Sequence, residues 1–100
     1  MYDINKMGEL KKYGELTPEI WKTFVAFDNA AFADGALPTK TKELIAVAVA
    51  LTTQCAYCID IHTKRAKKAG NSKEEIAEAV MVAAAIRAGG SITHGTHCLD

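Results

Sequence analysis

The sequence carries no excess of charge of either sign. Lys and Arg number 12, and Asp and Glu number 12, so the formal net charge is zero. No long-range field would therefore attract a nucleic acid or an anionic membrane surface. Hydrophobic residues make up 49% of the sequence, which is too many for a disordered tail, and 100 residues suit a single domain over residues 1–100.

The sequence also lacks the segments that direct a protein to a membrane or out of the cell. Charges interrupt the first 16 residues, where a signal peptide would need an apolar run. No apolar stretch reaches the roughly 18 residues that a membrane span requires. We therefore expect a cytoplasmic protein, and in that compartment a close cysteine pair is more often catalytic or metal-binding than structural.

Strand signals are missing, whereas helix signals recur. No Asn-Gly hairpin or alternating strand pair is present. Residues 1–16 read as an N-terminal arm with one helical turn near residues 7–13, ahead of a core at 17–99. Thr17 and Pro18 mark a helix start, and we expect that helix to end at Gly35.

Three further helices are expected in the core. The first begins near residue 39 or 41, the second ends at Gly70, and the third follows a capping box at Ser72 and Glu75 and stops at Gly89 and Gly90. Valines alternate with alanines at residues 44–51, which a strand could also explain, but the alanines and cap signals favour a helix. The predicted fold class is all-α.

Two of these helices have no polar face. Residues 44–51 and 80–86 are apolar on all sides, and such a helix must be buried on all sides. A chain of this size cannot enclose two central helices. We therefore expect a compact helical subunit that forms a homo-oligomer through its surplus apolar surface.

The stretch "LTTQCAYCIDIHTKRAKKAG" carries the chemistry. Cys55 and Cys58 are three residues apart, and His62 follows four residues later. On a helix these side chains share the inward face, with neighbours roughly 5–6 Å apart at Cβ. The two thiols can form a disulfide, and His62 can reach Cys58. The start of a helix favours a thiolate, so the pattern suits dithiol redox chemistry.

Two alternatives stay open on spacing alone. The thiols could be inert core residues. Cys55, Cys58 and His62 could instead be three zinc ligands, with a fourth from the C-terminal residues His94, His97 and Cys98, although the second half of a structural zinc motif is missing. A haem attachment site is excluded because Ile59 follows Cys58. A thioredoxin-like domain would need a βαβ pattern.

Glu43 is the only ionisable residue between Lys42 and Cys55. It could simply complement the dipole at its helix start. If its helix and the next form an antiparallel pair that turns near residues 53 and 54, Glu43 lies about 15 Å back from the turn, level with residues 62–65. Glu43 would then orient the His62 ring, and the order Glu43–His62–Cys58 would be a proton relay.

The combined pattern resembles the E-x11-C-x2-C-x3-H core of the AhpD-like alkylhydroperoxidases, in the carboxymuconolactone decarboxylase superfamily. The matching residues are Glu43, Cys55, Cys58 and His62, and the resemblance extends from about residue 17 to 99. It implies an all-helical subunit that assembles into trimers or hexamers. It implies no metal or organic cofactor.

The resemblance also implies an activity, the thiol-dependent reduction of hydroperoxides or disulfide oxidoreductase chemistry. Cys58 would attack the peroxide, Cys55 would resolve the sulfenic acid as a disulfide, and Glu43 and His62 would move the proton. An external dithiol, thioredoxin-like or lipoyl electron donor would restore the thiols. The superfamily's lactone decarboxylases lack the redox pair, so a protein without redox activity is the alternative from that branch.

Two features depart from a simple match. Some family members place a histidine directly before the second cysteine, where this chain has Tyr57, whose high reference pKa makes it a poor proton shuttle. The C-terminal "THGTHC" holds His94, His97 and Cys98, which read as polar residues near a subunit interface or as a second site.

Overall fold

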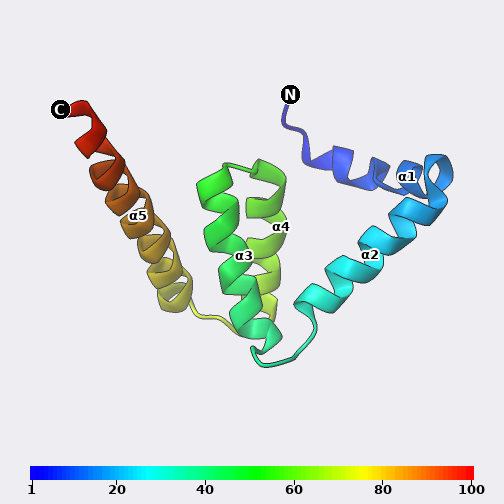
Figure 1. Ribbon diagram of the computed structural model, residues 1–100. Coiled ribbons are helices and arrows are strands. Elements are labelled where there is room, and N and C mark those ends of the chain that lie inside the picture. Colours follow the sequence, from blue (N-terminus) through cyan, green and yellow to red (C-terminus); the bar gives the residue numbers. More distant parts are fainter. The chain divides into compact units, whose positions relative to one another are not determined.

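The computed structural model describes residues 1–100 and contains only helices and connecting segments (Figure 1). The all-α prediction is therefore confirmed. The chain forms two compact units, Met1–Thr39 and Lys40–Asp100. The prediction of one domain, with an arm at 1–16 and a core at 17–99, stays a prediction.

The first unit contains three helical segments: the 3₁₀ helix η1 (Ile4–Glu9), α1 (Lys11–Leu16) and α2 (Pro18–Phe32). The prediction of a single helical turn in this arm underestimates its helix content, because most of residues 4–16 are helical. Asp3 caps η1 by accepting a hydrogen bond from the Asn5 backbone N–H at 3.0 Å. Tyr13, Trp21 and Phe24 then stack in series, with ring centroids 5.5 and 5.4 Å apart, which joins α1 to α2.

Both predicted ends of α2 need correction. The Thr17 side chain makes no N-cap hydrogen bond and instead donates to the Tyr13 carbonyl at the end of α1. At the other end the helix stops at Phe32, three residues before Gly35, because Ala33 is extended. Thr39 holds the following turn, since its backbone N–H donates to the Asp34 carboxylate and its hydroxyl to the Phe32 carbonyl.

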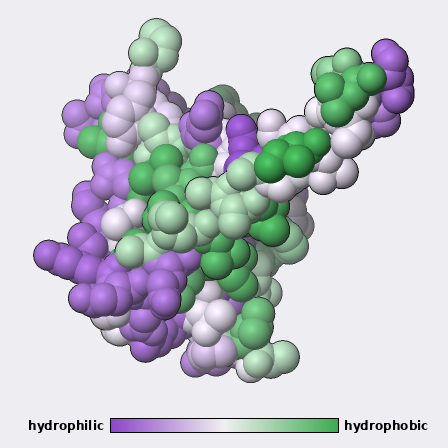
Figure 2. All heavy atoms as spheres, turned by 90° about the vertical axis from the view of Figure 1, so that its left-hand side faces the viewer, coloured by the Kyte–Doolittle hydropathy of each residue, from purple (hydrophilic) through white to green (hydrophobic).

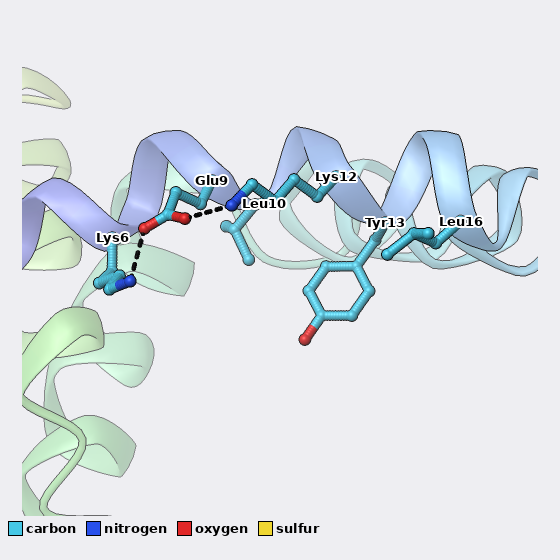
Figure 3. A pocket seen from close by; sticks show the side chains of 6 residues that line it. All are labelled: Lys6, Glu9, Leu10, Lys12, Tyr13 and Leu16. Carbon is cyan, nitrogen blue, oxygen red and sulfur yellow. Dashed lines mark hydrogen bonds and ion pairs between the residues drawn. The ribbon is translucent and has the colours of Figure 1, made fainter.

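A shallow groove of about 340 Å³ runs along η1 and α1 (Figure 3). Glu9 lies on it and pairs with both Lys12 and Lys6. Hydrogen bonds and charge from Lys12, then Lys6, lower the pKa of Glu9 to about 2. All three side chains are well exposed, so this triad contributes little to stability.

The second unit is built on an antiparallel pair, α3 (Thr39–Thr53) and α4 (Ala56–Lys68), which lie side by side (Figure 1). Asn71 closes the far end of the pair. Its side-chain amide donates to the Lys40 and Ala66 carbonyls, both at 3.0 Å, and its side chain is buried. These bonds tie the start of α3 to the end of α4 and hold the helices in register.

The last long helix, α5 (Lys73–Gly95), runs into a short 3₁₀ helix, η2 (Thr96–Cys98). The capping box is confirmed: Ser72 accepts from the Glu75 N–H, and Glu75 accepts from the Ser72 N–H. The predicted stop at Gly89 and Gly90 is wrong. Each helical glycine costs only about 1 kcal/mol relative to alanine, which the continuing run of backbone hydrogen bonds offsets.

Helix α5 runs in the same direction as α3. Lys40 pairs with Glu75 at 3.3 Å near the start of both helices. Further along, Arg87 Nη1 donates to the Thr52 carbonyl at 3.0 Å. Lys40 and Thr52 are as far apart on α3 as Glu75 and Arg87 are on α5, about 18 Å along each helix. The register of α5 against α3 is therefore fixed at two points.

Helix α5 leaves much apolar surface uncovered. Met81, Val82, Ile86 and Ile92 are each more than 60% exposed, whereas Ala83 is buried. Figure 2, which views the molecule from the side of α5, shows hydrophobic side chains gathered in a broad band. The expectation of surplus apolar surface is thus met.

The helical stretch Lys73–Cys98 is long and apolar enough to cross a membrane by length and composition, with a mean hydropathy of 1.4 over its most apolar window. This corrects the expectation that no segment reaches that length, because the alanines and aliphatic residues keep the mean high despite the glycines and Arg87. One such helix is weak evidence for a span. Arg87 lies inside it and bonds to α3, and such a charge is costly in a lipid core.

Candidate active site

Glu43 and His62 form a buried pair between α3 and α4. His62 Nδ1 lies 2.8 Å from Glu43 Oε2. The side chain of Glu43 is only 5% exposed and that of His62 17% exposed. A buried carboxylate needs such a partner. Because Nδ1 is engaged by Glu43, any proton exchange between His62 and a third group has to use the second ring nitrogen, Nε2.

Cys55 lies at a junction of two helices. Its backbone N–H donates to the Ala50 carbonyl at 3.1 Å, across Gln54 in the left-handed region at φ 56°. This is the Schellman arrangement that ends a helix. Cys55 is also the N-cap of α4, and its Sγ accepts the Cys58 N–H at 3.3 Å. The same residue thus ends α3 and begins α4, which confirms that the pair lies at a helix start.

The two thiols have opposite pKa shifts. The pKa of Cys55 is lowered, first by the hydrogen bond from the Cys58 thiol and then by backbone N–H donors. Cys58 donates that bond and is more buried, so its pKa rises to about 11. The reduced pair therefore loses its first proton from Cys55. A thiolate on Cys58 requires that its own proton be taken up by another group.

This order of proton loss predicts the reactivity of the pair. In a Cys98→Ala protein, iodoacetamide should modify Cys55 before Cys58, with a half-maximal rate at a pH below the ordinary thiol value of about 8.5. A lowered pKa means that the thiolate is present at lower pH. Changing Cys58 to Ala removes the hydrogen-bond donor, so the Cys55 midpoint should rise. Mass spectrometry of alkylated peptides across pH measures both, and preferential modification of Cys58 would contradict the prediction.

The zinc ligand set is not assembled. No group of three or more His, Cys, Asp or Glu side chains is placed to hold a metal ion. His94 and His97 stack on each other, 6.3 Å apart at their ring centroids, and Cys98 is exposed. The C-terminal residues therefore do not supply the fourth ligand considered for Cys55 and Cys58.

An apolar groove of about 180 Å³ lies between α3 and α5, close in sequence to the cysteines. It is lined by Leu51, Thr52, Val80, Ala83, Ala84 and Arg87. Thr52 precedes Cys55 by three residues, so their Cα atoms are at most about 11 Å apart. The groove offers an apolar surface next to the turn that carries the thiol.

Sequence reasoning found Glu43, His62 and both cysteines but missed Arg87, Gln54 and Asn71. One signal was available, because Arg87 is the single charged residue after Glu78 in an otherwise apolar helix. The sequence offers no such signal at Gln54, since glutamine does not favour a left-handed backbone. Arg87 and Asn71 contact residues that are distant in sequence, and the conformation of Gln54 depends on the turn between α3 and α4.

The fold and the site define a class of small all-helical protein, in which a buried Glu–His pair on two antiparallel helices lies beside a Cys-X-X-Cys pair at a helix start. The sequence model of the carboxymuconolactone decarboxylase family matches residues 18–100. The chain therefore belongs to this family, in the superfamily of the AhpD-like proteins, which includes both peroxidases and decarboxylases.

Solved structures agree. A carboxymuconolactone decarboxylase family protein from Legionella pneumophila, in its apo form, has a TM-score of 0.79 at 35% identity, over 92% of this chain and 82% of its own. A protein from Methanobacterium thermoautotrophicum has a TM-score of 0.81 at 34% identity, over 88% and 99%.

Sequence relatives are uncharacterised proteins. Protein 4 of the cox locus of Paracoccus denitrificans is 45% identical over 93 residues, covering 93% of this chain and 81% of the relative. A protein from Cupriavidus necator is 36% identical over 69 residues, covering 69% and 61%. None of these names assigns a reaction.

Proposed function

We propose that the protein is a thiol-dependent peroxidase that reduces organic hydroperoxides through Cys55 and Cys58. The observation that carries this proposal is the cysteine pair at the start of α4, where the Cys58 backbone N–H donates to the Cys55 sulfur, together with the Glu43–His62 pair between α3 and α4. A decarboxylase of the same superfamily has no use for the thiol pair. Peroxide consumption by wild type and Cys58→Ser tests the proposal.

The proposed cycle balances as follows. The Cys58 thiolate attacks the terminal peroxide oxygen and breaks the O–O bond, which leaves a Cys58 sulfenic acid and an alkoxide. The alkoxide takes a proton from His62 and leaves as an alcohol. Cys55 then gives up its proton and its sulfur attacks the Cys58 sulfur, which forms the disulfide, and the displaced hydroxide takes up that proton and leaves as water. Two electrons from an external dithiol restore both thiols.

Each residue of the relay has a role that suits its position. Glu43, buried and hydrogen-bonded to Nδ1, orients the His62 ring and offsets the charge of a protonated imidazole. Nε2 of His62 then takes the Cys58 proton, directly or through a water. The groove beside α3 provides an apolar surface for the organic part of the peroxide.

One observation favours a second candidate, disulfide oxidoreductase activity. Cys55, not Cys58, has the lowered pKa in the reduced pair. A thiolate on Cys55 is suited to attack an external disulfide, after which Cys58 closes the internal disulfide and releases the reduced partner. The external protein would be a thioredoxin-like or lipoyl carrier. Reduction of a small disulfide in the absence of peroxide tests this candidate.

We further propose that the working form is a homo-oligomer, a trimer or a hexamer, in the cytoplasm. Val82 and Ile86 project from the uncovered side of α5, and their exposure would be costly in an isolated subunit. The zero net charge provides no attraction to nucleic acid, and Arg87 argues against a membrane span.

Oligomerisation can be tested with one substitution. Ile86→Glu places a charge on the apolar side of α5 and should shift the sedimentation profile from oligomer towards monomer. Lys73→Glu, at the exposed start of the same helix, is the control and should leave the profile unchanged. A wild-type protein that stays monomeric at micromolar concentration would rule the proposal out.

A further inference from the structure

The turn that carries Cys55 is held in a costly backbone conformation. Gln54 has φ 56°, a left-handed conformation that costs a non-glycine residue about 1–2 kcal/mol. The turn persists because the Cys55 N–H bonds to the Ala50 carbonyl and the α4 N-terminus bonds to the Cys55 sulfur. Any fraying of the last turn of α3 would therefore displace the sulfur from the α4 N-terminus.

A side chain from a different helix fastens this last turn. The final carbonyls of a helix have no partner within it. Arg87 of α5 supplies one, since its Nη1 donates to the Thr52 carbonyl at 3.0 Å. Lys40 and Glu75 pair at the other end of the two helices, so α5 contacts α3 at both ends of the segment that carries the guanidinium to Thr52.

We propose that Arg87 is a positioning residue for the redox pair: by bonding to the Thr52 carbonyl it holds the strained turn at Gln54 and so keeps the Cys55 sulfur at the N-terminus of α4. Arg87 acts through the backbone of the turn and not on the reacting atoms. The inference rests on the proposed function only for the catalytic role of Cys55. The position of the Cys55 sulfur itself can be measured without peroxide.

The test compares Arg87→Met with Arg65→Met in a Cys98→Ala background. Both variants remove one arginine from an exposed position, but the structure gives Arg65 no contact with the turn. Arg87→Met should slow iodoacetamide modification of Cys55 at neutral pH by about twofold to tenfold, as loss of one hydrogen bond of ordinary net strength would. It should also move the redox midpoint of the Cys55–Cys58 disulfide in glutathione buffers. Arg65→Met should change neither.

A rescue variant distinguishes an effect of Arg87 on the turn from a general loss of stability. Gln54→Gly removes the left-handed strain, so adding it to Arg87→Met should restore most of the Cys55 reactivity. The proposal is overturned if Arg87→Met behaves like Arg65→Met, or if Gln54→Gly restores nothing while circular dichroism shows an intact fold. Absence of peroxidase activity in the wild type would count against the proposed function but would leave both readouts interpretable.

Discussion

Replacing Cys58 by serine is expected to lower peroxide turnover by at least roughly 10³-fold, as removal of a nucleophile does. Serine is close to cysteine in size and keeps a side-chain donor, and the backbone N–H of residue 58 that donates to the Cys55 sulfur is unchanged. The loss should therefore appear in turnover with little change in melting temperature. Peroxide consumption in the presence of several external dithiols measures it.

Replacing Cys55 by serine should give a different failure. Cys58 can still be oxidised, but no second thiol is available to resolve it, so the protein should stop after one turnover as a sulfenic acid or a mixed disulfide. Mass spectrometry distinguishes the two products. Cys98→Ser is the control, because Cys98 is exposed at the C-terminus and should be dispensable. Normal turnover by Cys58→Ser would defeat the peroxidase proposal, and a reversed pattern would exchange the roles of the two cysteines.

Removing the carboxylate of Glu43 is expected to have the largest effect outside the cysteine pair. Glu43→Gln keeps an acceptor for His62 Nδ1 but loses the charge that stabilises a protonated imidazole. General acid–base catalysis contributes about 10²–10⁴-fold, and we expect kcat to fall towards the lower end of that range. The matched control is Glu78→Gln, which removes an exposed carboxylate from α5.

A second variant distinguishes the role of Glu43 in orienting the His62 ring from its role in stabilising the fold. Glu43→Met also removes the acceptor, so His62 should no longer hold its proton on Nδ1. Nitrogen-15 NMR of His62 reports the tautomer, which a merely structural role for Glu43 would leave unchanged. Glu43→Met should also destabilise the fold, because the imidazole loses its buried partner. Wild-type turnover in both Glu43 variants would exclude the relay.

Local chemistry explains what the sequence could predict of the fold. The capping box at Ser72 and Glu75 depends on four consecutive residues, so it was predictable and is confirmed. The ends at Phe32 and Gly95 were not. Helix α2 stops before Gly35, where Ala33 is extended and Thr39 bonds to Phe32 and Asp34, whereas α5 continues through Gly89 and Gly90. A glycine permits a stop but does not require one.

The candidate site was predictable for a related reason. Cys58 and His62 lie within α4 and Cys55 is its N-cap, so the 3.6 residues per turn of one helix largely fix which of these side chains are neighbours. Glu43 required one further assumption, an antiparallel partner helix, and the 2.8 Å contact with His62 bears that assumption out. The residues that sequence reasoning missed make contacts that no helical period specifies.

The sequence by itself determined the all-α class and the cysteine pair at a helix start, because both follow from local spacing and cap signals. The pairing of Glu43 with His62 followed only once α3 and α4 were taken to be antiparallel. The tertiary structure decided two other things. It lowered the pKa of Cys55, which accepts hydrogen bonds from the side chain and backbone of Cys58, and raised that of Cys58, which donates to Cys55 and is more buried. It also brought Arg87 to the Thr52 carbonyl, since no local pattern specifies how α5 lies against α3.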